Sequence, residues 1–323
     1  MLAEVIRSGF AESRHRGSVL ALGADGTPVL RAGQVTGPMF PRSVNKPLQA
    51  AALLRAGLDL DGKLLALAAA SHSGEDFHVA GVREILARAG LAEDALRCPP
   101  ALPMDEQAQR EVLRRGGGPD RVHMNCSGKH AAMLACCVAN GWPAGSYLDP
   151  AHPVQQTIRG TLADLASEHI EQVGVDGCGA PLFALSLTGL TRALRVLVTA
   201  PAGTPERRVA DAFRAHPDWT SGSRRPERAL MAAVPGLLVK SGAEGAEGLA
   251  LADGRAAAFK LEDGASRARP AVTVAVLRHL GVASEPGVAG GSGVDDAALD
   301  QIAHVPVFGG EQEVGVVRAT LPA

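Results

Sequence analysis

A serine and a lysine three residues apart, Ser43 and Lys46, form the first group in the chain that could carry out covalent chemistry. A serine hydroxyl is a poor nucleophile until a base removes its proton. A lysine amine serves as that base only when burial or a nearby cation lowers its pKa. Residues three apart share one face of a helix, so the amine of Lys46 can reach the hydroxyl of Ser43. The alternative is structural: Ser43 caps a helix and Lys46 lies in solvent.

Lysine is scarce in this chain, which favours a role for each one. The 32 basic residues include only five lysines, at positions 46, 63, 129, 240 and 260. Lys240 begins a Lys-Ser-Gly sequence at the end of an apolar run. This element, downstream of Ser-x-x-Lys, resembles the Lys-Thr-Gly element of serine β-lactamases and penicillin-binding proteins, and the order along the chain matches.

Residues 71–75, SHSGE, place two hydroxyls and an imidazole at the end of another apolar run. At such a junction a buried segment reaches solvent, where functional residues are common. Ser73 would also suit the N-cap of the helix that follows, with Glu75 in its first turn. Ser71 falls deeper in the apolar run, so its hydroxyl needs a hydrogen-bond partner.

Two cysteine-containing segments could bind a metal or hold a reactive thiol. In residues 125–130, NCSGKH, Cys126 and Lys129 lie three residues apart just before a helix. A neighbouring ammonium favours the thiolate, which is the form of cysteine that binds metals. Cys178 lies between two glycines that let the backbone approach a ligand closely. The alternative, which is common in proteins, is that these thiols pack as small hydrophobic side chains.

Five motifs in one order are more specific than any one of them. The segments are RSVNKP, ASHSGEDFH, NCSGKHAAMLA, DGCGAP and VKSGAEG. In this order and at these distances they resemble the Rhizobium etli-type L-asparaginases, the asparaginase II family with a serine β-lactamase-like fold. The resemblance covers about residues 12–262.

The resemblance implies roles for ten residues and an oligomeric state. It implies two Ser/Lys pairs, a metal site for zinc beside the substrate pocket, three polar residues that bind or lie near the substrate, and a homodimer. The pairs are Ser43 with Lys46 and Ser71 with Lys240, the zinc ligands are Cys126, Lys129 and Cys178, and the substrate-binding candidates are Arg42, His130 and Asp176.

The reaction expected from this resemblance is that of an amidohydrolase acting on L-asparagine. Ser43, deprotonated through Lys46, attacks the side-chain amide, while Lys240 tunes the base and Ser71 relays a proton. Ammonia leaves, and water resolves the aspartyl ester to L-aspartate. Because the substrate is a zwitterion, its pocket needs a cation and an anion, for which Arg42 and Asp176 are the candidates.

Other activities stay open at this level. The same fold could serve another serine amidohydrolase, an esterase, a D-alanyl peptidase or a β-lactam-binding enzyme, and a pocket without turnover could serve as a sensor of asparagine or of thiol oxidation. Preference for asparagine over glutamine depends on one methylene of pocket length. That is a discrimination of about 1–3 kcal/mol, which no residue spacing reveals.

The elements that must position these residues are predicted from periodicity and turn residues. Residues 18–30 read as a β-hairpin around Ala-Asp-Gly-Thr, and a helix is expected to begin near Ser43. The chain then alternates amphipathic stretches with Gly-rich turns. Helices are predicted over 76–90, 103–115, 131–141, 153–170, 204–215 and 266–280, strands over 236–242, 247–251, 254–264 and 313–321, and a loop over 284–296.

Strands that bracket a helical middle favour an α+β fold. We expect an antiparallel sheet built from N- and C-terminal segments and packed against helices, as in serine β-lactamases and penicillin-binding proteins. No Pro/Ser linker interrupts the chain, so a single asparaginase domain over residues 1–323 is expected.

Composition excludes several classes of protein. With 32 Lys and Arg against 34 Asp and Glu, the chain is not a polycation built for nucleic acid, and 3% aromatic residues leave few platforms for base stacking. Hydrophobic residues make up 46%, as in a folded protein. Five cysteines, an odd number, argue against a disulfide framework. With no signal peptide or membrane span apparent, we expect a cytoplasmic protein without membrane or nucleic-acid partners.

Overall fold

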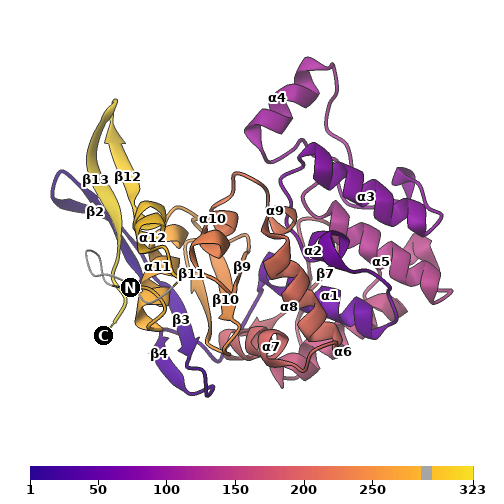
Figure 1. The fold of residues 1–323 in the computed structure, drawn as a ribbon, viewed down its shortest axis with the longest axis horizontal. Helices are drawn as coiled ribbons and strands as arrows, with labels where there is room; N and C mark the ends of the chain where they lie inside the picture. Colours follow the sequence, from indigo (N-terminus) through magenta and orange to yellow (C-terminus); the bar gives the residue numbers. More distant parts are fainter. Residues whose placement is uncertain (285–292, 323) are drawn as a thin grey trace. The chain divides into compact units, whose positions relative to one another are not determined.

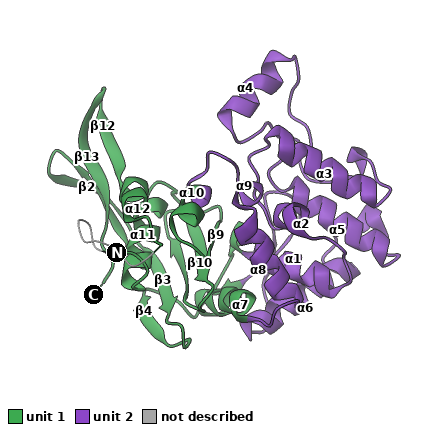
Figure 2. Cartoon of the chain, in the orientation of Figure 1, with its two compact units in different colours: residues 1–44, 185–199, 229–323 green, residues 45–184, 200–228 purple. Residues whose placement is uncertain are grey.

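The structure is a computed structural model that describes residues 1–284 and 293–322, and the chain divides into two compact units (Figure 2). Residues 285–292, in the middle of the expected loop 284–296, lie outside the described residues. The expectation of one domain over the whole chain stays a prediction. Unit 1 comprises residues 1–44, 185–199 and 229–323, and unit 2 comprises residues 45–184 and 200–228.

Unit 1 contains two main antiparallel sheets that join the first residues of the chain to the last (Figure 1). In the four-stranded sheet, of order β12-β13-β1-β2, Ala3 lies opposite Ala319. In the five-stranded sheet, of order β4-β3-β11-β10-β9, Val19 lies opposite Phe259. An antiparallel arrangement of N- and C-terminal segments is therefore confirmed, and it is divided between two sheets.

The strands of unit 1 are β1 (Ala3–Arg7), β2 (Phe10–His15), β3 (Gly17–Leu22), β4 (Pro28–Ala32), β5 (Pro38–Met39), β8 (Leu185–Ser186), β9 (Leu237–Ser241), β10 (Ala246–Leu251), β11 (Ala256–Leu261), β12 (Val305–Gly309) and β13 (Gln312–Ala319). The predicted hairpin over residues 18–30 is confirmed as β3 and β4, and the four predicted later strands correspond to β9, β10, β11 and β13.

Helices cover the sheets of unit 1. Helix α7 (Leu187–Thr199) packs on β3, β10 and β11, whereas α11 (Arg269–His279) contacts β13 and α12 (Asp296–Ala303). Leu190, Leu194 and Leu197 recur at helical spacing on α7 and are fully buried. The sheet of unit 1 is thus packed against helices, as the α+β class requires.

Unit 2 is mainly helical. Its helices are α1 (Lys46–Arg55), α2 (Gly62–Ala68), α3 (Asp76–Arg88), α4 (Glu106–Arg114), α5 (Ser127–Ala139), α6 (Pro153–Ala166), α8 (Pro205–Ala215) and α9 (Pro217–Thr220). It also contains the short strands β6 (Val173–Val175) and β7 (Pro181–Phe183). Helix α10 (Pro226–Ala233) begins in unit 2 and ends in unit 1. Three 3₁₀ turns, η1 (Arg42–Asn45), η2 (Glu93–Ala95) and η3 (Ala144–Ser146), complete the chain's described helical elements.

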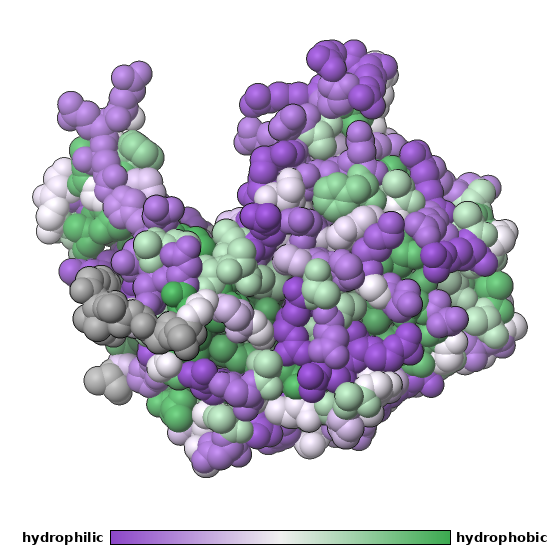
Figure 3. All heavy atoms as spheres, in the orientation of Figure 1, coloured by the Kyte–Doolittle hydropathy of each residue, from purple (hydrophilic) through white to green (hydrophobic). Residues whose placement is uncertain are grey.

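Helix α1 forms the centre of unit 2. It contacts α2, α5, α6 and α8, and residues 46–54 are all buried. Helix α4 is the opposite case, because it has no buried residue, and Figure 3 shows it as a hydrophilic surface. A helix that is buried on every side can hold a functional side chain away from water. Within the described ranges, we find no helix that is both long and apolar enough to cross a membrane.

Candidate active site

Ser43 lies in a tight turn of unit 1 and not at the start of an α-helix. Residues Arg42–Asn45 form a 3₁₀ helix, and α1 begins only at Lys46, with Asn45 as its N-cap. The prediction that an α-helix begins near Ser43 was therefore early by one turn, and the N-cap role for Ser43 is wrong. Arg42 has a φ of 49°, in the left-handed region that non-glycine residues rarely adopt. Strained backbone of this kind is characteristic of functional sites.

Lys240 projects from the face of the sheet on which the Ser43 turn packs. On β9, Lys240 lies opposite Gly248 of β10. A Cβ atom on Gly248 would lie 2.6 Å from Val44 and 2.6 Å from Leu194. Directly opposed residues of antiparallel strands point to the same face of a sheet. Lys240 therefore shares its face with Val44, the residue that follows Ser43.

The end of β9 is packed directly against this turn. Lys240 is buried, and its Nζ donates to the carbonyl oxygen of Ser241 at 2.5 Å. A Cβ atom on Gly242 would lie 3.0 Å from the Pro41 carbonyl oxygen and 3.1 Å from Val44. The glycine of the Lys-Ser-Gly element therefore allows the strand end and the turn to approach closely.

Lys46 is enclosed in unit 2. It is 1% exposed, and its Nζ donates to the Ala70 carbonyl oxygen at 2.7 Å, to Ser71 Oγ at 2.9 Å and to Cys126 Sγ at 3.0 Å. These three contacts fix the position of the amine. The structural alternative, a solvated Lys46, is wrong. The resemblance implied that Ser71 pairs with Lys240; within unit 2, its partner is Lys46.

His72 fixes the segment that carries Ser71. The Ser71 backbone N–H donates to the Thr220 carbonyl oxygen at 3.2 Å. The Nδ1 of His72 accepts from the Gly74 N–H at 3.1 Å, so its Nε2 carries the hydrogen and donates to Ser127 Oγ at 2.8 Å. Complete burial lowers the pKa of His72 well below its ordinary value, which keeps the ring neutral. No role was predicted for His72 from the sequence, although its place beside Ser71 was a signal.

Ser73 does not cap the helix that follows it. The N-cap of α3 is Glu75, and Ser73 Oγ donates to the Ser221 carbonyl oxygen at 2.8 Å. The carboxylate of Glu75 accepts from the N–H of Ser223 at 2.9 Å and from its hydroxyl at 2.6 Å. Residues 221–223 therefore form a strap bonded to the segment that carries Ser71.

The three predicted zinc ligands meet in the interior of unit 2. Cys126 and Cys178 pack in one buried cluster with Ala180, and Lys129 Nζ donates to Cys178 Sγ at 3.2 Å. A hydrogen bond from Cys178 and the charges of Lys46 and Lys129 hold the pKa of the Cys126 thiol well below its ordinary value. The pKa of Cys178 is raised, chiefly by the same bond to Cys126. Cys126 is therefore the more acidic thiol of the pair.

The two sulfurs of this cluster are donors that zinc accepts, and three protein ligands are the number found in catalytic zinc sites. A lysine must lose its proton to bind a metal. Burial lowers the pKa of Lys129, but the charges of Cys178 and Cys126 outweigh burial and raise it. Across residues 1–284 and 293–322, no group of three or more His, Cys, Asp or Glu side chains could hold a metal ion, so a site here depends on Lys129.

His130 and Asp176 lie on two sides of this cluster. His130 is fully buried, with its Nδ1 2.6 Å from the hydroxyl of Tyr147, and burial lowers its pKa. Asp176 is partly exposed in the turn between β6 and β7, with Oδ2 3.8 Å from Cys178 Sγ. Of these two predicted substrate-binding residues, Asp176 is the one that reaches the surface.

Arg42 belongs to the unit 1 part of the site. Its guanidinium lies 3.8 Å from the carboxylate of Glu244 in an ion pair. In unit 1 the structure thus packs the turn that carries Arg42 and Ser43 against the end of the strand that carries Lys240. In unit 2 it brings together Lys46, Ser71, Cys126, Lys129 and Cys178, with His130 and Asp176 beside them.

The remaining cysteines play a packing role. All five cysteines of the chain are buried and free of disulfides, which confirms the expectation of reduced thiols. Burial raises the pKa of Cys136 to about 12 and that of Cys137 to about 11, so both are inert at neutral pH.

Ser43 follows a residue with left-handed backbone, and both Lys46 and Lys240 are buried. The model of the L-asparaginase II family matches residues 3–319. The chain belongs to this family.

Solved structures resemble the chain at low sequence identity. A structure of Mglu in its native form in 4.3 M NaCl has a TM-score of 0.43 and 14% identity, covering 86% of this chain and 64% of Mglu. The chain thus spans less than two thirds of the Mglu chain. A putative β-lactamase from Bacteroides dorei and a β-lactamase from Mycobacterium bovis each have a TM-score of 0.44 and 16% identity over 82% of this chain, covering 93% and 94% of theirs. Among curated proteins, no match is found.

Proposed function

We propose that this protein is an L-asparaginase, which hydrolyses L-asparagine to L-aspartate and ammonia. One observation carries the proposal: Lys46 of the Ser-x-x-Lys motif is buried and bonded to Ser71, in a chain that the L-asparaginase II model matches over residues 3–319. Lys240 is buried on the face of the sheet against which Val44 packs, and it supplies a second amine.

In the acylation step, Ser43 Oγ attacks the side-chain amide carbon of asparagine. Its proton passes to Lys46, and the carbonyl π electrons move to the oxygen to give a tetrahedral intermediate. When the carbonyl re-forms, the carbon–nitrogen bond breaks. The departing nitrogen takes a proton from the lysine and leaves as ammonia, and Ser43 carries an aspartyl ester.

Deacylation uses the same groups in reverse. Water gives up a proton to the basic group and attacks the ester carbon, the bond to Ser43 Oγ breaks, and the serine regains its proton. In this proposal the hydroxyl of Ser71, 2.9 Å from Lys46 Nζ, relays protons. Lys240 supplies the positive charge that keeps Lys46 able to act as a base.

Substrate binding requires two opposite charges. We assign the α-carboxylate of asparagine to Arg42 and its α-ammonium to Asp176, because a guanidinium and a carboxylate form charge-assisted hydrogen bonds with these groups. His130 supports the cluster from the interior.

We further propose that zinc binds at Cys126, Lys129 and Cys178. When bound, the ion supplies a positive charge that stabilises both thiolates and fixes the segments that carry them. Metal analysis of the desalted protein should find about one zinc per chain. Cys178→Ser should lose it and Cys136→Ser, a matched buried cysteine of α5, should keep it. Equal metal content in the two variants would reject the site.

The proposal includes a cytoplasmic homodimer with no nucleic-acid or membrane partner. The near-neutral charge and the scarcity of aromatic residues support the absence of a nucleic-acid partner. Light scattering of the purified chain tests the homodimer. A mass of one chain, 33.2 kDa, would reject it.

The deciding experiment is Ser43→Ala, with ammonia release from L-asparagine as the readout. Loss of the nucleophile should lower kcat by about 10³-fold or more. Ser146→Ala, at an exposed serine of unit 2, should keep the wild-type rate. A Ser43→Ala variant that retains near wild-type turnover would remove Ser43 as nucleophile. Side-by-side kinetics with L-glutamine give the amide preference.

A further inference from the structure

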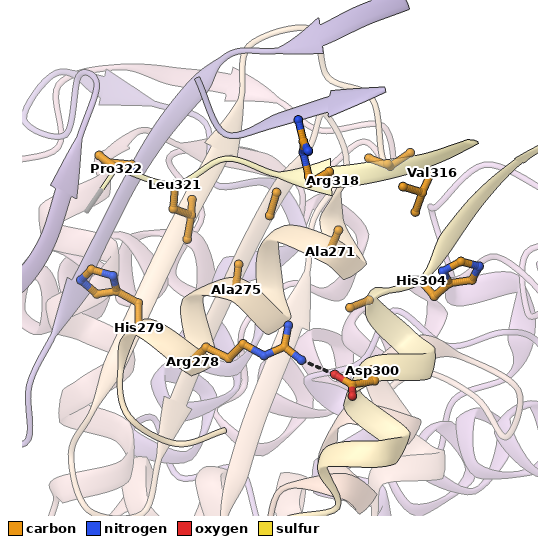
Figure 4. A pocket seen from close by; sticks show the side chains of 13 residues that line it. Ala271, Ala275, Arg278, His279, Asp300, His304, Val316, Arg318, Leu321 and Pro322 are labelled. Atoms are coloured by element: carbon orange, nitrogen blue, oxygen red, sulfur yellow. Dashed lines mark hydrogen bonds and ion pairs between the residues drawn. The ribbon is translucent and has the colours of Figure 1, made fainter. Parts of the chain in front are cut away.

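Three side chains that line one cavity of unit 1 form ion pairs near the surface. The cavity, of about 820 Å³, lies among α11, α12 and β13 (Figure 4). In each pair at least one side chain is more than 40% exposed, and exposed pairs contribute little to the position of a segment. The pairs are Arg278 with Asp300, His304 with Glu313, and Arg318 with Glu4.

Glu75 of unit 2 is a buried carboxylate whose close partners are uncharged donors. Its side chain is 11% exposed. It accepts from the backbone N–H of Ser223 at 2.9 Å and from the Ser223 hydroxyl at 2.6 Å. The guanidinium of Arg224 lies farther away, at 3.7 Å, on a side chain that is half exposed. Because hydrogen bonds to a buried charge are strong and little screened, the two bonds to Ser223 hold this end of the strap.

Residues 221–223, the strap, lie directly on the segment that precedes Glu75. The Ser221 carbonyl oxygen accepts from Ser73 Oγ at 2.8 Å. A Cβ atom on Gly222 would collide with Ser73 Oγ and would lie 2.8 Å from Glu75 Oε1. The glycine therefore allows the strap to approach these side chains closely. A displacement of the strap at one end is transmitted along this contact.

The same stretch of chain fixes the backbone of Ser71. The Ser71 N–H donates at 3.2 Å to the carbonyl oxygen of Thr220, the residue just before the strap. The hydroxyl of Ser71 accepts from Lys46 Nζ at 2.9 Å. Hydrogen bonds weaken steeply when their partners are displaced. A shift of the strap that moves Thr220 therefore weakens the bond between Ser71 and Lys46.

We propose that Glu75 is a positioning residue for the asparaginase reaction. Its carboxylate holds the strap, and the strap holds Ser71 within hydrogen-bond reach of Lys46. This inference rests on the proposed function, in which Ser71 relays protons to and from Lys46. Glu75 acts through Ser71 and not on the substrate, so its loss should lower kcat and leave KM nearly unchanged.

Glu75→Met and Glu75→Gln test the role of the carboxylate in steady-state kinetics with L-asparagine. Methionine cannot accept either bond, so kcat should fall about tenfold, the loss expected for one charge-assisted hydrogen bond, while KM changes by less than about twofold. Glutamine keeps both bonds, because its amide oxygen accepts from the N–H and its amide nitrogen donates to the hydroxyl oxygen. Glu75→Gln should therefore keep kcat within about twofold of the wild type.

Glu206→Met is the matched control. Glu206 is also a buried carboxylate of unit 2, but it lies on α8 and accepts from Arg55 at 2.6 Å. Its loss should leave kcat unchanged. Hydrogen exchange then measures the position of Ser71 without turnover. The amide of Ser71 should exchange about tenfold faster in Glu75→Met than in the wild type, and at the wild-type rate in Glu206→Met.

Four results would overturn the proposal. They are wild-type kcat in Glu75→Met, an equal loss of kcat in Glu75→Gln, an equal loss in Glu206→Met, and unchanged exchange at Ser71 in Glu75→Met. If Glu75→Met fails to fold, Ser223→Ala, at a partly exposed position, replaces it. This variant removes the 2.6 Å bond and should lower kcat about threefold, and wild-type kcat there would also overturn the proposal.

Failure of the proposed function gives a different result. A wild-type chain that releases no ammonia from L-asparagine would reject the asparaginase activity. The exchange rate at Ser71 would still decide whether Glu75 holds that residue in place, because the measurement needs no substrate.

Discussion

Lys46 in unit 2 and Lys240 in unit 1 show two ways in which the molecule buries an amine. Lys46, on α1, donates to acceptors that lie 24, 25 and 80 residues away in the chain. Lys240, on the edge strand β9, donates to the carbonyl oxygen of the next residue. The position of Lys46 is therefore fixed by contacts to residues distant in the chain, whereas Lys240 has a bond to the strand that carries it.

Histidines repeat the contrast between the units. In unit 2, burial lowers the pKa values of His72, His78 and His130, so that these rings are neutral. In unit 1, His15 and His304 each lie beside a carboxylate. Unit 2 thus keeps three uncharged imidazoles in its core, whereas its His123 lies beside an acid, as do His15 and His304 of unit 1. The buried polar groups of unit 2 therefore depend on exclusion of water.

The largest expected effect separates the two lysines. Lys46→Met should lower kcat/KM for asparagine by about 10³-fold or more, because the base is lost. Lys240→Met should cost about 10²-fold, because it removes a charge that only tunes the base. Lys63→Met, at an exposed lysine, is the control. A larger loss for Lys240 than for Lys46 would reverse the assigned roles.

Acid stability tests the neutral core of unit 2. The pKa of His78 is about 4 in the folded chain, since burial disfavours its charge, against 6.5 when unfolded. Below pH 6.5 the unfolded chain therefore binds the extra proton, and stability falls as the pH drops to about 4, by about 3 kcal/mol from this residue. When the free energy of unfolding is measured by urea titration at several pH values in this range, it should fall less steeply with falling pH in His78→Gln than in the wild type. Identical pH dependence in the wild type and the variant would contradict the assignment.

Packing of the Ser43 turn on the sheet of unit 1 can be tested at Gly248. An added Cβ would meet both Val44 and Leu194 at 2.6 Å. We expect Gly248→Ala to lower the free energy of unfolding by about 2 kcal/mol, the cost of overpacking, and to lower kcat. Gly118→Ala, where an added Cβ meets nothing within 4 Å, is the matched control. If Gly248→Ala lowered the free energy of unfolding but left kcat unchanged, this packing would contribute to stability and not to catalysis.

The smallest effect is expected at the surface of unit 2. Arg224 donates two hydrogen bonds to Asp105, at 2.8 and 2.6 Å, but its side chain is 51% exposed. Arg224→Gln should therefore change the free energy of unfolding by less than about 1 kcal/mol. Arg110→Gln, which breaks an exposed pair with Glu106, should behave alike. A loss of several kcal/mol at Arg224 would show that the surface, and not the core, stabilises unit 2.

Sequence periodicity and turn residues predicted many helices and strands, but they did not predict helix α7. The hairpin over residues 18–30 and the helix that begins at Asp76 carry clear turn and periodicity signals. Helix α7 was not predicted, because Gly189 and the neighbouring threonines lower its intrinsic helix propensity. It forms because its leucines bury against the five-stranded sheet, a gain that no local window contains.

The sequence by itself determined the α+β class and which residues could react, since Ser43, Lys46, Cys126 and Lys240 stand in recognisable spacings. The tertiary structure alone decided the partners: Lys46 with Ser71 and Cys126, and Lys129 with Cys178. Periodicity shows which face of a helix is buried. It carries no record of which distant side chain meets that face, because such contacts form only when segments far apart in the chain pack together.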